Sequence, residues 1–267
     1  MTTAVHADPT VAPGPLAPIE MTLAAMRARL GDTATHGVHR SILVNSPAGW
    51  VPAARLTDGS RVPQLVDTAK QRWGAAPHVA AALAWKSYTY WLALPAVAGY
   101  VTARRVPLLR PEDVLVDFHD RQPFLAIGMA TPAVAVLQSD PLAATATPGV
   151  VVVPDEPALL DLLRETLFDA HLDPVLDRIR ERVHVGRRTM LGSVASGVAY
   201  GITRATGHAS PESTVELIGA VLDALGVADL VELSATPGGD VRVQRRTCCL
   251  AFTLPEPKIC SGCVLRA

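Results

Sequence analysis

Residues 79–101 read VAAALAWKSYTYWLALPAVAGYV and form the most apolar stretch of this 267-residue chain. Lys86 is the one charged residue in it, and Pro95 falls near its end. A membrane-spanning helix needs about 20 consecutive apolar residues, and no charge-free run here reaches that length. The stretch therefore predicts a long helix from Pro77 to about Tyr100, kinked before Pro95, that is buried in a folded domain.

Outward from this helix, hydrophobic periodicity predicts further helices on both sides and short strands between them. Further helices are expected over Pro18 to Leu30, Val62 to Trp73, Asp155 to Leu167, Asp173 to Val183, Arg187 to Ala205 and Ser210 to Leu225. Alternating residues at Val114–Phe118, Phe124–Ile127 and Val134–Leu137 predict an antiparallel meander, with one more strand at Val150–Val153 and a hairpin of Leu230–Leu233 with Val241–Arg246.

The expected fold class is α+β, mostly helical, with a small antiparallel sheet in the middle and a C-terminal cluster-binding tail. The expected organisation is a disordered tail over residues 1–17, an N-terminal α+β lobe over 18–154, and a helical lobe over 155–267 that carries the C-terminal tail.

Composition narrows the classes of function. Hydrophobic residues make up 49% and charged residues 18% of the chain, so a sizeable core can form. The net charge of −1 provides no basic field, so nucleic acid is not an expected partner. No secretory signal precedes the first helix, so we expect a cytoplasmic protein whose thiols stay reduced. Peripheral contact with a membrane or a transporter is left open.

All four cysteines lie between residues 248 and 263, in the pattern C-C-x₁₀-C-x₂-C. Cys260 and Cys263 are spaced so that both thiolates can reach one metal centre, with Gly262 relieving the strain of the turn. Cys248 and Cys249 would point to opposite faces of a strand, so they need a bulge or turn to act together. An iron–sulfur cluster, a structural zinc ion and a disulfide or thiol redox pair are all compatible with these residues.

The segments Arg-Arg-Thr-Cys-Cys-Leu (245–250) and Cys-Ser-Gly-Cys-Val-Leu (260–265) resemble the C-terminal signature of the FhuF-type ferric siderophore reductases. That resemblance implies a [2Fe–2S] cluster held by Cys248, Cys249, Cys260 and Cys263. It also implies one-electron reduction of ferric iron in a siderophore, with the hydroxamate type expected first, and release of Fe(II). The electron would come from another protein, such as a ferredoxin or flavoprotein.

A weaker resemblance to the same family extends over residues 75–267. It rests on Trp85–Tyr88, on Pro107–Asp117, on His171–Pro174 and on Arg188–Ala195. Within the last segment this chain reads Met-Leu-Gly-Ser at 190–193, where the family has a run closer to Leu-Trp-Gly-Asn, so it lacks both the aromatic residue and the amide.

Positive charge gathers around the tail. Residues 241–267 contain five basic side chains and one acidic side chain, which would attract an anionic chelate and raise the reduction potential of an anionic cluster. The candidate substrate-binding residues are Arg187, Arg188, Arg245, Arg246 and Lys86. A solubilising surface is the alternative for the tail. For Arg187 and Arg188 at a helix start, the alternatives are an acidic neighbour and, favoured over both binding roles, a plain surface position after a loop.

Other polar and aromatic residues receive a structural interpretation first. Tyr88, Tyr90 and Trp91 can line a chelate pocket but suit a core better. His119 with Asp117 and Asp120 suits a solvated strand face better than a metal site. His36 and His39 receive no role, and Gly192, Gly197 and Gly201 indicate close helix packing rather than nucleotide binding. The competing functions are a zinc-stabilised binding module and an iron–sulfur or siderophore-handling protein without turnover.

Overall fold

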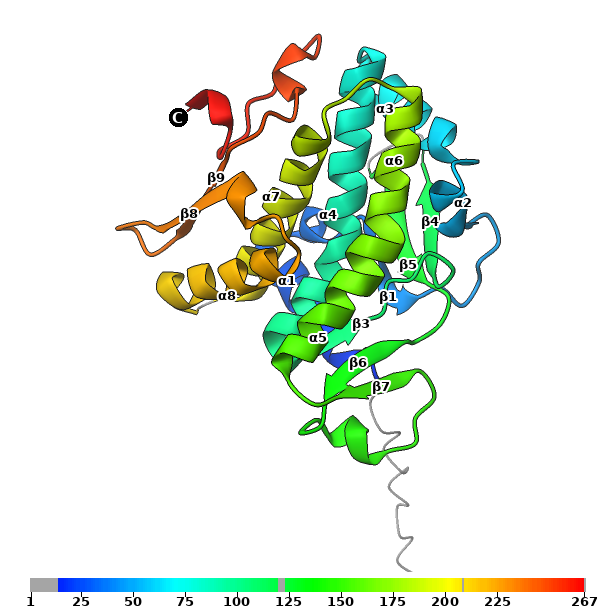
Figure 1. Cartoon of the computed structure of the whole chain (residues 1–267), viewed down its shortest axis with the longest axis vertical. Coiled ribbons are helices and arrows are strands. Elements are labelled where there is room, and N and C mark those ends of the chain that lie inside the picture. The colour runs from blue at the N-terminus through cyan, green and yellow to red at the C-terminus, as the bar shows by residue number, and fades with distance from the viewer. Residues whose placement is uncertain (1–13, 120–122, 208, 267) are drawn as a thin grey trace, which may run out of the picture.

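A computed structural model describes residues 14–119, 123–207 and 209–266 (Figure 1). The first thirteen residues of the predicted disordered tail, and the turn residues 120 and 121, lie outside these ranges. The α+β class, mostly helical, is confirmed. The helices are α1 (Ala17–Leu30), α2 (Ala54–Thr57), α3 (Val62–Trp73), α4 (Pro77–Ala103), α5 (Glu156–Leu163), the π-helical segment η3 (Arg164–Leu172), α6 (Asp173–Arg182), α7 (Arg187–Ala205) and α8 (Pro211–Ala224).

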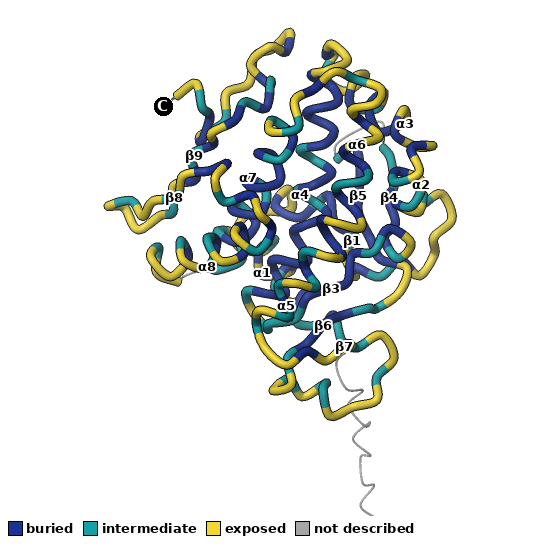
Figure 2. The backbone as a smooth tube through the Cα atoms, in the orientation of Figure 1, coloured by how far each residue is buried: buried dark blue, intermediate teal, exposed yellow. Residues whose placement is uncertain are grey.

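The long apolar helix α4 is the centre of the molecule. Eighteen of its 27 residues are buried, and the tube in Figure 2 is dark along most of its length. It packs along α7 and also contacts α1 and α3. Gly201 of α7 allows close packing of the two helices, because a Cβ there would lie 2.9 Å from the Val97 side chain of α4. The predicted buried helix is therefore confirmed, and it continues three residues beyond Tyr100.

Two small sheets cover other sides of the helices. One has the strand order β1-β5-β4-β2, formed by Val38–Leu43, Leu125–Met129, Val114–Phe118 and Val51–Pro52. The other has the order β3-β6-β7, formed by Arg105–Pro107, Val134–Leu137 and Val150–Val153. The hydrophobic core is continuous across the helices and both sheets.

The predicted three-stranded meander is wrong in its connectivity. Strands β4 and β5 pair antiparallel as expected, but β6 belongs to the second sheet, between β3 and β7. Each sheet also contains one parallel pair, β1 with β5 and β6 with β7. The alternating pattern therefore located the strands, whereas their partners depend on long-range packing that periodicity does not report.

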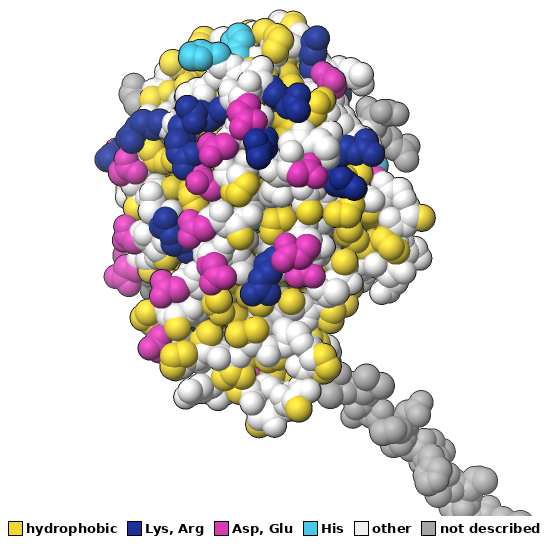
Figure 3. Space-filling model, turned by 45° about the vertical axis from the view of Figure 1, so that its right-hand side comes forward, with side chains coloured by type: hydrophobic (Ala, Val, Ile, Leu, Met, Phe, Trp, Pro, Cys, Tyr) yellow, Lys and Arg dark blue, Asp and Glu magenta, His cyan; other side chains and the backbone are white. Residues whose placement is uncertain are grey.

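The C-terminal region packs against α7, from Gly192 to Tyr200, and also contacts α4. Strands β8 (Val231–Ala235) and β9 (Val241–Arg245) form the predicted antiparallel hairpin, and β9 leads into the cysteine-bearing tail (Figure 1). Within the described ranges, no helix has both the length and the apolar character that a membrane crossing requires. On the face in Figure 3, basic and acidic side chains are interspersed, in keeping with the net charge near zero.

Candidate metal centre

The chain leaves its last strand before it reaches the first pair of cysteines. Thr247 packs onto α7 at Gly192, where a Cβ would lie 1.9 Å from the Thr247 hydroxyl. Two residues after Cys248, Leu250 adopts a left-handed conformation with φ of 64°, which is uncommon for a residue other than glycine. In this turn the Leu250 N–H donates to the Cys248 sulfur at 3.3 Å. Cys248 and Cys249 are thus in a turn, as joint metal binding requires, and not in a strand.

The second pair of cysteines is fixed to β9. The Arg245 N–H donates to the Gly262 carbonyl at 2.9 Å, and the Gln244 side chain donates to the Cys263 carbonyl at 3.0 Å. A Cβ on Gly262 would lie 2.0 Å from the Val243 carbonyl oxygen. The predicted reason for Gly262 is therefore corrected: its φ is not positive, and glycine is required because the loop lies so close to the strand.

Three of the four thiols share one electrostatic environment. Burial raises the pKa of the Cys260 thiol, and the neighbouring thiols of Cys249 and Cys263 raise it further. The positive charges of Lys86 and Arg245 lower the same pKa. Cys249 and Cys263 are buried, whereas Cys248 and Cys260 are partly exposed, and all four are free. Among the residues that the structure describes, however, no three His, Cys, Asp or Glu side chains are arranged closely enough to hold one metal ion.

Arg245 is a buried cation whose hydrogen bonds are incomplete. Its side chain is 2% exposed, and Nη2 donates to Ser193 Oγ at 3.1 Å. The other two nitrogens, Nε and Nη1, have no partner among the described residues. A buried guanidinium with unpaired donors is unfavourable by several kcal/mol unless an anion lies beside it. An anionic metal–thiolate centre on the neighbouring cysteines would supply that anion, so these residues fit such a group.

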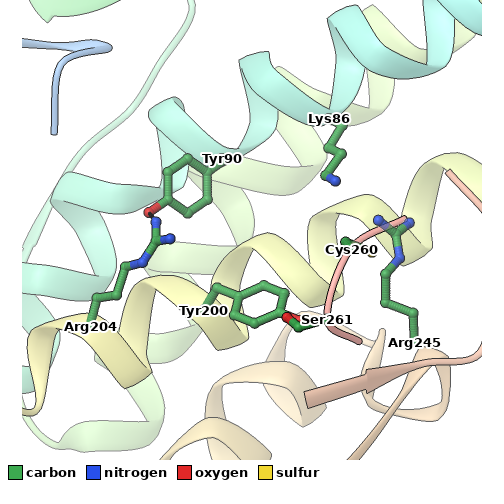
Figure 4. Close-up of a pocket in the computed structure, with 7 residues that line it drawn as sticks. All are labelled: Lys86, Tyr90, Tyr200, Arg204, Arg245, Cys260 and Ser261. Carbon is green, nitrogen blue, oxygen red and sulfur yellow. Dashed lines mark hydrogen bonds between the residues drawn. The ribbon is translucent and has the colours of Figure 1, made fainter. Parts of the chain in front are cut away.

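Two cavities meet at Cys260, and Lys86 of α4 lines both. We call the first the cationic cavity; it has a volume of about 300 Å³ (Figure 4). It is lined by Lys86, Tyr90, Tyr200, Arg204, Arg245, Cys260 and Ser261. The second cavity, of about 320 Å³, has Cys249 and Cys260 in its wall. Two of the five predicted substrate-binding residues, Lys86 and Arg245, are therefore brought together beside the thiols.

The other three predicted substrate-binding residues pair with acidic side chains elsewhere. Arg187 donates to Asp173 and Asp177, and Arg188 contacts Asp229 at 2.8 Å. Arg246 lies 4.0 Å from Glu232 on the surface of the β8–β9 hairpin. None of the three lines either cavity at Cys260. Arg187 and Arg188 therefore pair with acidic neighbours, which was one of the alternatives for them.

Tyr200 and Arg204 are residues of the cationic cavity that sequence reasoning missed. They lie one turn apart on α7 and face Lys86 and Tyr90, which lie one turn apart on α4 (Figure 4). The i,i+4 spacing of polar residues on two mostly apolar helices was the available signal. It was not sufficient, because only the packing of α4 against α7 brings the two pairs to one cavity.

The remaining aromatic and histidine candidates divide between core and surface. Tyr88 is buried and donates to His171 Nε2, while His171 Nδ1 donates to the Leu109 carbonyl at 2.7 Å. Burial lowers the pKa of His171 to about 4, so the ring is neutral and can accept from the phenol. His119 lies 3.6 Å from Asp117, both partly exposed, and Asp120 lies outside the described residues.

His36, His39 and Trp91 complete these candidates. His36 packs against Trp91 with tilted rings whose centroids are 5.1 Å apart, and His39 lies edge-on to Trp50. Trp91 also packs against Tyr90, with ring centroids 4.6 Å apart. These are packing contacts, whereas Tyr90 also lines the cationic cavity.

Comparison with known proteins assigns no family to the chain. The sequence matches no model of a protein family, and no curated protein matches it significantly. The resemblance of the tail to the ferric siderophore reductases therefore stays a prediction.

Proposed function

We propose that this chain is a ferric siderophore reductase that holds a [2Fe–2S] cluster on Cys248, Cys249, Cys260 and Cys263. The observation that carries the proposal is the buried Arg245, which has two unpartnered donors next to a group of free thiols. A positive charge in that position matches the negative charge of a metal–thiolate centre. The spacing of the cysteines and their resemblance to the reductase signature favour iron–sulfur over zinc.

The chemistry requires one electron and no acid–base pair. When bound, the cluster supplies that electron. Siderophore oxygens are hard donors that hold Fe(III) far more tightly than Fe(II), so reduction of the ferric substrate releases the metal. A reductase of this kind must therefore bring the chelate close to its thiols and stabilise added negative charge there.

The residues of the chain meet these requirements. Cys249 and Cys263 are buried and would anchor the centre, while Cys260 lies in the wall of the cationic cavity. Lys86 and Arg245 place positive charge near Cys260, which stabilises the more negative state of any group bound there. The Leu250 N–H already donates to a cysteine sulfur, a contact that also stabilises thiolate charge.

The electron donor in this proposal is a separate cytoplasmic protein, such as a ferredoxin or flavoprotein. Three large hydrophobic side chains near the cysteines are well exposed: Phe252, Ile259 and Leu265 are 40%, 47% and 54% exposed. Exposed apolar side chains among basic residues are typical of a surface that binds an acidic protein transiently.

Anaerobic stopped-flow absorption spectroscopy tests the proposal. The protein is reduced with dithionite, freed of excess reductant and mixed with ferric siderophores of the hydroxamate and catecholate classes. We expect the reduced protein to be reoxidised, with Fe(II) trapped by ferrozine in equal amount. A protein that contains a cluster but is reoxidised by none of them is a sensor or handling protein, and a colourless zinc protein is a binding module.

A further inference from the structure

The cationic cavity has three basic side chains in its wall and no acidic one among its described lining residues. In the part of the chain that the structure describes, the Lys86 ammonium has neither an ion-pair nor a hydrogen-bond partner. Arg245 has two unpartnered nitrogens. The arginines 187, 188 and 246, in contrast, all lie near carboxylates. The positive charge of Lys86 and Arg204 is thus balanced by no described carboxylate in this wall, even where Arg245 pairs with the proposed centre.

The opposite wall of the cavity is aromatic. Arg204 donates to the Tyr90 hydroxyl, and its guanidinium lies 5.5 Å from the centre of the Tyr90 ring. Tyr200 donates to the Val243 carbonyl at 3.3 Å, which fixes its ring beside Ser261. Figure 4 shows Lys86 descending from α4 toward Cys260 and Arg245, with the two tyrosines on the other side. A flat anionic group can therefore meet Lys86 and Arg245 on one side, and the two tyrosine rings together with Arg204 on the other.

Resting on the proposed function, we infer that the cationic cavity selects ferric chelates with net negative charge, above all those with catecholate arms. Three hydroxamates carry three negative charges and only neutralise Fe(III), whereas three catecholates carry six and leave the complex strongly anionic. A cavity of about 300 Å³ is at the small end of ligand pockets, so it takes one arm of the chelate and not the whole complex.

This selectivity differs from what the tail resemblance implies, which is a hydroxamate substrate first. The preference for negative charge comes from the cavity alone. Lys86, Arg204 and Arg245 would cause it, and they come from α4, α7 and β9 and meet only in the folded chain. Because Cys260 is part of the same wall, an arm bound here lies directly beside the thiol group.

Isothermal titration calorimetry with gallium(III) complexes tests the inference, since gallium has the charge of ferric iron but accepts no electron under these conditions. The probes are the gallium complexes of a tripodal tris-catecholamide and of a neutral, N-acetylated linear trihydroxamate, titrated into the oxidised protein as isolated. We expect the anionic complex to bind at least about tenfold more tightly, with an advantage that shrinks as salt is raised.

Lys86→Gln and Arg204→Gln are the test variants, and Arg242→Gln is the matched control. Arg242 is an exposed residue of β9 that does not line the cavity, so its replacement removes the same charge from the same region. Each test variant should weaken binding of the anionic complex by roughly tenfold or more, and the control by far less. Thermal melts establish that each variant is folded. Because the two test residues lie on different helices, one variant still tests the inference if the other does not fold.

Equal affinity for the two gallium complexes, or equal losses in test and control variants, would overturn the inference. The outcome is separable from that of the proposed function. Charge-selective gallium binding by a protein that reduces no siderophore leaves this inference standing alone. Reoxidation by ferric siderophores without charge-selective binding supports the reductase and removes the inference.

Discussion

Replacing Arg245 with methionine should change two properties of the protein in opposite directions. Methionine fills a similar volume without charge or donors. In the protein stripped of metal, the unpartnered Nε and Nη1 are each unfavourable by about 1–3 kcal/mol, while the Nη2 bond to Ser193 is favourable by about 1.5–3 kcal/mol. The difference predicts that Arg245→Met stabilises the metal-free protein by about 2 kcal/mol. For a chain of this size that corresponds to a rise in melting temperature of about 4–8 °C.

In the protein with its cluster, the same substitution should lower the reduction potential. For an assumed separation of about 5 Å and an effective dielectric constant of about 20, loss of a unit charge would withdraw about 3 kcal/mol of stabilisation from the reduced state. For a one-electron couple this would lower the potential by about 130 mV. The sign follows from Arg245 being positive, since a cation favours the state with more negative charge.

Calorimetric melts of the chelator-treated protein and EPR-monitored redox titrations of the protein as isolated measure the two effects. Arg242→Met is the control, because it removes an exposed charge from the same strand and should alter both properties little. A metal-free Arg245→Met protein that melts below the metal-free wild type would show that the buried guanidinium does not destabilise the fold when no anion lies beside it. An unchanged potential would show that no cluster lies beside it.

Three further predictions concern other parts of the molecule. Cys249→Ser should lose the visible absorption of the cluster, whereas Ser261→Ala in the tail should keep it; equal iron and sulfide contents in both would contradict the ligand assignment. Gly192→Ala places a Cβ 1.9 Å from the Thr247 hydroxyl and should destabilise the fold by about 1–3 kcal/mol in urea unfolding, with Thr247→Ala recovering part of the loss. Burial lowers the pKa of His171 from 6.5 to about 4. Between pH 4 and pH 6.5 the unfolded chain therefore binds a proton at this histidine that the folded chain does not bind. The free energy of unfolding should therefore fall by up to about 3 kcal/mol as the pH drops through that window, and a His171→Leu variant with the same pH dependence would refute this.

Much of the fold follows from local patterns in the sequence. The apolar run of 79–101 predicts a buried helix, and the structure buries Trp85 and Tyr100 within it almost completely. Proline and glycine signals also marked several helix ends, such as Gly74, which has a positive φ at the end of α3. Which strands pair is decided by contacts between distant segments. Strand β6 therefore lies between β3 and β7 although its pattern suited a meander.

The candidate site divides in the same way. The cysteine spacing and the nearby basic residues can be recognised in the sequence because they lie within one short segment. The position of Lys86 beside Cys260 depends on the docking of the tail between α4 and α7, as do the roles of Tyr200 and Arg204. The sequence also did not reveal that Arg245 is buried, since most arginines near a chain end are exposed.

The most direct test of the account is the absorption and EPR spectrum of the protein purified without oxygen, together with its iron, sulfide and zinc contents. We expect a reddish-brown protein with two irons and two sulfides per chain, EPR-silent as isolated and with a single paramagnetic signal after reduction with dithionite. A colourless protein with one zinc ion per chain and no iron would contradict it.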